Sequence, residues 1–227
     1  MTILLFDIDG TLIKTAGAGG TALLEAFGES FGVSEPAAVP FSGRTDRGIV
    51  QDLFRRHHVP DSPENWVLLR CEYLRRLRHY LPLFAGEVLP GVRQLLDRLA
   101  RHSNIAVGLL TGNMCQGARL KLEHYELMHY FSFGGYGDAH ADRDQVAHEA
   151  LAACRRYWDG YARSEPVWVV GDTPLDIQCA RAIGAKGVAV ATGWHDYKSL
   201  EDAQPDLLLH DLRETEAVLM RICAASV

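Results

Sequence analysis

Short apolar runs alternate with longer amphipathic segments along most of the chain. The apolar runs predict strands at residues 3–6, 105–110, 167–170 and 187–191, with shorter ones at 131–134 and near Leu207. Between them, apolar residues recur at helical spacing, as they do at Val92, Leu95, Leu96 and Leu99. Strands that alternate with helices predict an α/β fold, with a Rossmann-like parallel sheet covered by helices on both faces.

Residues 16–87 interrupt this alternation. A glycine-rich stretch at 16–20, which we interpret as a hinge, leads into a helical pattern. Two further helices are expected over 46–57 and 63–80, and this part of the chain has no strong strand signal. We therefore expect a small helical domain at 16–87, inserted into a catalytic core made of residues 1–15 and 88–227.

Polar side chains follow three of the predicted strands. These residues are Asp7, Asp9, Thr111, Asn113, Asp172 and Asp176. In open parallel sheets, ligands bind outside the carboxyl ends of the strands. The sequence therefore predicts that these side chains meet in one site.

Composition and charge narrow the range of partners. The chain has 227 residues, of which 48% are hydrophobic and 23% charged, and its formal net charge is −6. It therefore lacks the basic field that gathers nucleic acid or anionic membranes. No apolar run approaches the roughly 18 residues of a membrane span, and no secretory signal precedes the first strand. We expect a cytoplasmic monomer or homodimer that binds neither nucleic acid nor membrane.

The predicted site suits phosphoryl transfer. Its carboxylates favour Mg²⁺, and the lack of neighbouring His or Cys disfavours zinc. The metal would cancel the repulsion between Asp7 and a phosphoryl group, so that Asp7 can attack and form an aspartyl phosphate. Asp9 would protonate the leaving oxygen and later activate water. Thr111 and the backbone amides of Gly112 and Asn113 would hold phosphoryl oxygens.

Three ordered motifs carry a family resemblance. They are Asp-Ile-Asp-Gly-Thr at 7–11, an apolar strand followed by Thr111, and Gly-Asp-Thr-Pro-Leu-Asp at 171–176. With them the chain resembles the haloacid dehalogenase-like (HAD) phosphohydrolases, in particular the branch of phosphoglycolate phosphatase and β-phosphoglucomutase. The resemblance implies a helical cap, for which 16–87 is the candidate. It also implies that Asp7, the Asp9 carbonyl and Asp172 bind Mg²⁺, with Asp176 as a supporting carboxylate.

Several functions fit these motifs. Dehalogenating members of the family lack the second aspartate, so Asp9 favours hydrolysis of a small phosphorylated metabolite. A phosphomutase would use the same two aspartates and stays open, as does a non-catalytic interaction protein on the same scaffold. A phosphorylatable receiver domain also places acids and a threonine at strand ends, but it would be about half this length and would not need a helical lobe.

Two arginines are further candidates. The polar turn at 42–46 would bring Arg44 to the site, where it meets a carboxylate or second phosphate of the substrate; a solvated loop residue is the equal alternative. The family also places a lysine after the third core strand, and none is found there. Arg143 occupies about that place, and we expect it, rather than Lys121, to supply the cation. A surface pair with a neighbouring aspartate is the alternative for Arg143.

Overall fold

The computed structural model describes residues 1–158 and 165–224, and a six-stranded sheet organises this part of the chain. The strand order is β5-β4-β1-β6-β7-β8, and each neighbouring pair is parallel. The strands are β1 (Thr2–Phe6), β4 (Ile105–Leu110), β5 (Gly134–Gly135), β6 (Val167–Gly171), β7 (Lys186–Val190) and β8 (Leu207–Leu209). The predicted α/β class and Rossmann-like core are confirmed.

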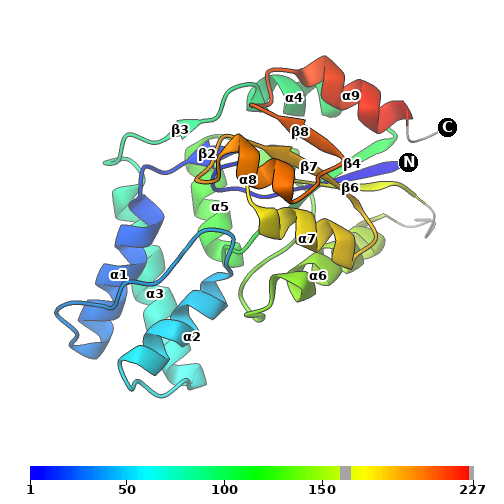
Figure 1. The fold of residues 1–227 in the computed structure, drawn as a ribbon. Coiled ribbons are helices and arrows are strands. Elements are labelled where there is room, and N and C mark those ends of the chain that lie inside the picture. The colour runs from blue at the N-terminus through cyan, green and yellow to red at the C-terminus, as the bar shows by residue number, and fades with distance from the viewer. Residues whose placement is uncertain (159–164, 225–227) are drawn as a thin grey trace.

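Helices cover both faces of the sheet (Figure 1). The described helices are α1 (Ala18–Phe31), α2 (Asp46–Arg56), α3 (Pro63–Tyr80), α4 (Val92–Leu99), α5 (Cys115–His124), α6 (Arg143–Tyr157), α7 (Pro174–Ala182), α8 (Tyr197–Asp202) and α9 (Thr215–Ala224), with a 3₁₀ turn at Met128–Tyr130. Alternate residues of β1 point to opposite faces. Leu4 and Phe6 pack with α4 and α9, while Ile3 and Leu5 pack with α6 and α7. This burial on both faces explains the unbroken apolar run.

Helices α1, α2 and α3 pack around a second hydrophobic cluster, apart from the sheet (Figure 1). Phe27 and Phe54 lie at its centre and are almost fully buried. Burial of such a side chain contributes about 1.5–3 kcal/mol to folding. The polar residues before α2 and α3 fix where each helix begins, because Thr45 and Ser62 accept hydrogen bonds from the backbone N–H groups of Gly48 and Asn65.

Two short strands connect the helical part to the sheet part. Strands β2 (Ile13–Lys14) and β3 (Glu87–Val88) pair antiparallel, with Ile13 opposite Val88. They lie beside the boundaries expected at 16 and 87, where the chain enters and leaves the helical part. The division into two domains stays a prediction.

Three local predictions were wrong. The strand expected at 131–134 is Gly134–Gly135, because Phe131 and Phe133 are buried in the segment that leads from the 3₁₀ turn into the strand. The glycine-rich stretch expected to be a hinge is partly helical, since α1 begins at Ala18. The sequence predicts a helix from Gln145 to Tyr157, but α6 begins two residues earlier, at Arg143, because the Asp142 carboxylate caps it.

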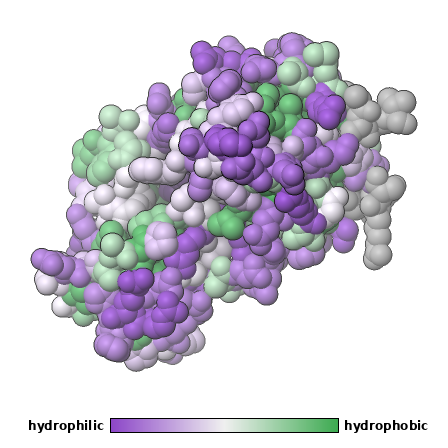
Figure 2. Space-filling view, in the orientation of Figure 1, coloured by the Kyte–Doolittle hydropathy of each residue, from purple (hydrophilic) through white to green (hydrophobic). Residues whose placement is uncertain are grey.

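The distribution of hydrophilic and hydrophobic residues on the surface is typical of a globular protein. Figure 2 shows a largely hydrophilic face, with paler and hydrophobic residues where the helical part meets the sheet part. Within the described residues, no helix is both long and apolar enough to cross a bilayer.

Candidate active site

The carboxyl ends of β1, β4, β6 and β7 open into a cleft of about 1020 Å³ between the sheet part and the helical part. Its core-side lining includes Asp7, Asp9, Gly112, Asn113, Lys121, Arg143 and Asp172. The helical part contributes Arg44, Asp46 and Tyr73. The polar tips of three separate strands thus meet at one edge of the sheet, which is where a parallel α/β sheet binds ligands.

Asp7 is held by Arg143. Arg143 Nη2 lies 3.0 Å from Asp7 Oδ2, and the same nitrogen donates a hydrogen bond to the Asp176 carboxylate. All three side chains are buried. Burial alone would favour a neutral guanidinium, but the charges of Asp176 and Asp7 outweigh it and raise the pKa of Arg143 above its usual range. Arg143 therefore fixes the orientation of Asp7 as a permanent cation.

Asp9 is held by a different cation. The Lys121 Nζ lies 2.6 Å from Asp9 Oδ2 and 2.6 Å from Asn113 Oδ1. The Asn113 amide donates to Asp9 Oδ2 at 2.8 Å and to Thr111 Oγ1 at 2.8 Å. The Lys121 side chain is only 5% exposed, whereas that of Asp9 is 39% exposed. Lys121 thus lies behind Asp9, and Asp9 reaches the open cleft.

The sequence presented Arg143 and Lys121 as alternatives for one cation. The structure places both in the cleft lining, each against a different aspartate. Lys121 reaches the site from α5, eight residues after Asn113, which is about two helical turns.

Asp172 is the most enclosed carboxylate that lines the cleft. It is 1% exposed, and its Oδ1 accepts a hydrogen bond from the Thr11 hydroxyl at 3.1 Å. A Cβ atom on Gly10 or Gly193 would come within 2.3 or 1.6 Å of Asp172 Oδ2, so only glycine fits at either position. Burial, followed by the charges of Asp176 and Asp7, raises the pKa of Asp172 well above its usual value. No described cation forms a direct ion pair with this carboxylate, and the charge of Arg143 offsets the rise in its pKa only in part.

These acids can hold a divalent cation. One carboxylate oxygen from each of Asp7, Asp172 and Asp176 lies within 4.8 Å of the other two. Asp176 also accepts hydrogen bonds from the Thr173 backbone at 2.9 Å and its hydroxyl at 2.8 Å, which fixes its position at the start of α7. An all-oxygen donor set with uncompensated negative charge fits a hard cation.

The residues expected to hold phosphoryl oxygens surround the start of α5. Thr111 is buried, and its Oγ1 accepts from the Asn113 backbone N–H at 3.3 Å. Gly112 is enclosed by the helical part: its carbonyl accepts from Asp46 N at 2.7 Å, and a Cβ atom would lie 2.0 Å from the Arg44 carbonyl oxygen. Gly112 and Asn113 therefore lie at the junction of the two parts of the molecule.

Arg44 lines the cleft, but it already has partners on α2. Its Nη2 lies 2.7 Å from Asp52 Oδ2 and donates to the Gly48 carbonyl at 3.1 Å. The turn at 42–46 thus lies at the site, as expected from the sequence, with the Arg44 charge paired inside the helical part.

Sequence reasoning missed two residues of the helical part. Asp46 Oδ2 accepts from Met114 N at 2.8 Å, and burial raises the pKa of Asp46 to about 6, against the opposing effect of Lys121. Tyr73 is 2% exposed, and burial followed by the charges of Asp46 and Asp9 raises its pKa well above the usual value. An acid at a helix N-terminus and an aromatic residue at core spacing are both ordinary structural features, so neither residue indicated a functional site in the sequence.

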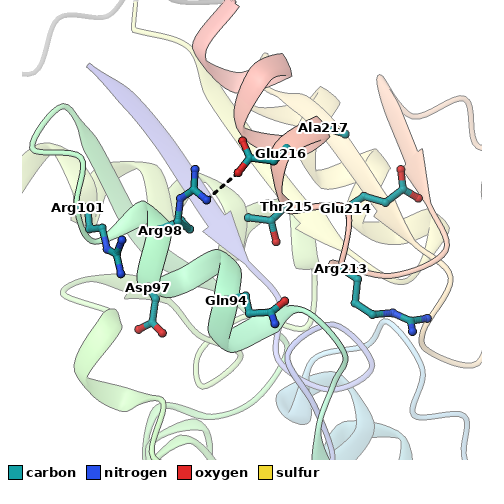
Figure 3. Close-up of a pocket in the computed structure, with 9 residues that line it drawn as sticks. All are labelled: Gln94, Asp97, Arg98, Arg101, Arg213, Glu214, Thr215, Glu216 and Ala217. Atoms are coloured by element: carbon teal, nitrogen blue, oxygen red, sulfur yellow. Dashed lines mark ion pairs between the residues drawn. The ribbon is translucent and has the colours of Figure 1, made fainter.

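A second hollow, of about 490 Å³, lies between α4 and the start of α9 (Figure 3). Most of the residues that line it have polar or charged side chains, and Arg98 and Glu216 form an ion pair of 2.7 Å. It contains none of the motif residues. The cleft at the strand ends is therefore the candidate active site.

Comparisons with known proteins agree with this geometry. A family profile described as haloacid dehalogenase-like hydrolase matches residues 4–190. A phosphoglycolate phosphatase of Synechococcus elongatus is 30% identical over 97% of this chain and 100% of its own length. A phosphoglycolate phosphatase of Aliivibrio fischeri is 26% identical over 96% of each protein.

Solved structures share the fold. A hydrolase from Pseudomonas syringae aligns with a TM-score of 0.70 at 22% identity, covering 98% of this chain and 99% of that one. A putative β-phosphoglucomutase from Thermotoga maritima aligns with a TM-score of 0.60 at 22% identity, covering 98% of this chain and 100% of that one. From the family match, the relatives and the strand-end cleft together, this chain belongs to the haloacid dehalogenase-like hydrolase family and is a phosphoric monoester hydrolase.

Proposed function

We propose that this phosphatase hydrolyses a small-molecule phosphate monoester in a Mg²⁺-dependent reaction, with Asp7 as the nucleophile and Asp9 as the acid and base. One observation carries the proposal: the two aspartates share a cleft, but each has its own cation, Arg143 for Asp7 and Lys121 for Asp9. Asp7 is enclosed and oriented, as a nucleophile requires, whereas Asp9 reaches the open cleft, as proton exchange requires.

The reaction would proceed in two displacements at phosphorus. An Asp7 carboxylate oxygen attacks, the bond from phosphorus to the ester oxygen breaks, and protonated Asp9 gives its proton to the leaving oxygen. Asp9, now a carboxylate, takes a proton from a water molecule that attacks the same phosphorus. The bond from phosphorus to Asp7 then breaks, which releases inorganic phosphate and restores Asp7. Thr111 and the amides of Gly112 and Asn113 would bind the phosphoryl oxygens.

Magnesium would be held by Asp7, Asp172 and the Asp9 carbonyl oxygen, and Asp176 would support the site through Arg143. Asp172 supports this assignment, because burial and the charges of Asp176 and Asp7 destabilise its ionised form, and a bound cation would relieve that. When bound, the cation neutralises phosphoryl charge, so that the Asp7 carboxylate can approach. Arg44 would contact the substrate beyond its phosphate, a role that its pair with Asp52 restricts.

The relatives named phosphoglycolate phosphatase support a small phosphorylated substrate. The cytoplasmic location and the monomeric or homodimeric state stay predictions. The phosphomutase and the non-catalytic protein, which the sequence left open, are outcomes of the following test.

Hydrolysis of p-nitrophenyl phosphate with Mg²⁺ and with excess EDTA tests the proposal. We expect turnover that EDTA abolishes and Mg²⁺ restores, and none in Asp7→Asn, whose amide is a poor nucleophile. Asp202→Asn is a matched control, because Asp202 is exposed and, among the described residues, pairs only with Lys198. Equal rates with and without EDTA would contradict the metal role. Absence of turnover with any phosphate ester would favour an interaction protein, and transfer of the phosphoryl group to a second substrate hydroxyl would favour a mutase.

A further inference from the structure

The three most enclosed cations that line the cleft are already paired with acids. Arg143 contacts Asp7 and Asp176, Lys121 contacts Asp9, and Arg44 contacts Asp52. A carboxylate on the organic part of a substrate needs a cationic partner when it leaves water. Among the described lining residues, only Lys14 and His195 remain as other basic groups.

Neither remaining basic group replaces a buried cation. Lys14 is exposed, and the His195 Nε2 lies 3.3 Å from the Ser42 hydroxyl at an exposed position. Charges exposed to water interact only weakly with a partner. The inner cleft therefore lacks, among the described residues, an enclosed and unpaired cation for a second negative group besides the phosphate.

The helical part adds a negative group of its own. Asp46 Oδ2 accepts from Met114 N, and its other oxygen has no hydrogen-bond partner among the described residues. With a pKa of about 6, Asp46 is ionised at pH 7.5. An ionised carboxylate in the wall repels a carboxylate on the substrate and accepts a hydrogen bond from a hydroxyl group.

Tyr73 offers a complementary polar group. Its side chain is enclosed, it lines the cleft, and no hydrogen bond connects its hydroxyl to any described residue. A Cβ atom on Gly117 would lie 3.4 Å from this hydroxyl, which places it next to the first turn of α5. An enclosed hydroxyl without a partner gains most from a ligand that hydrogen-bonds to it.

The rest of the wall is apolar and roomy. Leu23, Phe41 and Ile49 line it on the side of the helical part, and Trp194, which is 91% exposed, lies at the rim. A volume of about 1020 Å³ far exceeds that of a two-carbon ester. The cleft can therefore hold an organic part with apolar faces as well as hydroxyl groups.

We propose that the cleft selects phosphate monoesters whose organic part is an uncharged alcohol or polyol and rejects those that carry a carboxylate, with Asp46 and Tyr73 as the selecting groups. This inference rests on the proposed function and names the substrate class of the same site. Phosphoglycolate carries a carboxylate, so the proposed substrate class differs from the activity for which the relatives are named, phosphoglycolate phosphatase. Asp46 repels the carboxylate, and both side chains hydrogen-bond the hydroxyl that replaces it.

Two esters that differ only at the distal group test this selection: 2-hydroxyethyl phosphate and phosphoglycolate. Each is used at pH 7.5 as a competitor of p-nitrophenyl phosphate hydrolysis, so that its inhibition constant is measured however fast it is itself hydrolysed. We expect the constant to be at least about tenfold lower for 2-hydroxyethyl phosphate, which is one decade of affinity. An equal or lower constant for phosphoglycolate overturns the proposal.

Variants assign the effect to residues. Asp46→Asn keeps an oxygen for Met114 N but loses the charge, so we expect the ratio of the two constants to fall severalfold, through tighter binding of phosphoglycolate. Tyr73→Phe should weaken binding of 2-hydroxyethyl phosphate alone. Asp61→Asn is the matched control, since Asp61 pairs with Arg47 outside the cleft, and it should leave the ratio unchanged.

The possible results distinguish the proposed substrate class from the proposed phosphatase function. An unchanged ratio in Asp46→Asn overturns the role of Asp46. If p-nitrophenyl phosphate is hydrolysed but phosphoglycolate binds better, the substrate class is wrong and the proposed function stands. If the wild-type protein hydrolyses no phosphate ester, the proposed function itself fails.

Discussion

The surroundings of Arg143 change what we expect from its substitution. The sequence left open a surface pair with a neighbouring aspartate, but Arg143 is the first residue of α6 and its guanidinium is buried between Asp7 and Asp176. Removal of one partner from a buried ion pair leaves uncompensated charge and costs about 3–5 kcal/mol. Arg143→Ala should therefore lose most of kcat and also lower the free energy of unfolding, measured by urea denaturation. Arg143→Lys should recover part of both. Full stability in Arg143→Ala would contradict the buried network.

Lys121 acts on the other aspartate, so its loss should have a different effect. Lys121→Met removes the partner of Asp9 without touching Asp7 or Arg143. We expect kcat for p-nitrophenyl phosphate to fall about 10²-fold or more, the range of acid–base catalysis, with a smaller change in KM. Lys198→Met is the control, because Lys198 is exposed on α8. If kcat is unchanged in Lys121→Met, Lys121 does not orient the acid.

Asp46 should make stability depend on pH in a defined direction. Because its pKa is raised from 3.8 to about 6, the folded protein holds this proton more tightly than the unfolded chain. The stability due to this group is present below pH 3.8 and is lost as pH rises through about 6. Asp46→Asn should therefore stabilise the protein by roughly 1–3 kcal/mol at pH 8 and by much less at pH 4. Urea denaturation of both proteins at the two pH values measures this difference, and an equal effect at both would contradict it.

At the scale of elements, the start of α2 is fixed to the loops of the core. Backbone N–H groups of Asp46 and Arg47 donate to the carbonyls of Gly112 and Gly137 at 2.7 and 3.1 Å, and the Thr45 hydroxyl donates to Ala141 O at 3.1 Å. Gly112 makes this approach possible because it lacks a Cβ atom.

Gly112→Ala tests this contact. The added Cβ atom would lie 2.0 Å from the Arg44 carbonyl oxygen, and backbone rather than a flexible side chain must move. We expect a lower Tm together with a loss of kcat, because the start of α2 and the Thr111 loop would separate. A variant with wild-type Tm and kcat would show that the two parts do not meet closely in solution.

The sequence predicted elements well where local signals agree and poorly where packing decides. Helix α3 matches its predicted bounds of 63–80, because Ser62 and Pro63 mark its beginning. The pair β2 and β3 was not predicted, since two-residue strands leave no periodicity. Helices α8 and α9 were also missed, although Asp196 caps α8.

At the scale of the whole molecule, the alternation of strands and helices was sufficient to predict the parallel sheet and the edge at which the polar side chains meet. Strand ends carry the aspartates, and a parallel topology brings strand ends together. Asp46 and Tyr73 could not be predicted in the same way, because they reach the cleft only through the docking of helices on the core. Periodicity shows that a side chain is buried, but it does not show which loop it meets.

The central claim is that Asp7 carries the phosphoryl group during turnover. Borohydride reduces an aspartyl phosphate to homoserine, so the enzyme can be quenched during turnover of p-nitrophenyl phosphate with Mg²⁺, reduced, and mapped by peptide mass spectrometry. The account predicts conversion at Asp7 alone, which disappears with EDTA and in Asp7→Asn. Conversion at another carboxylate, or steady turnover with none at Asp7, would contradict it.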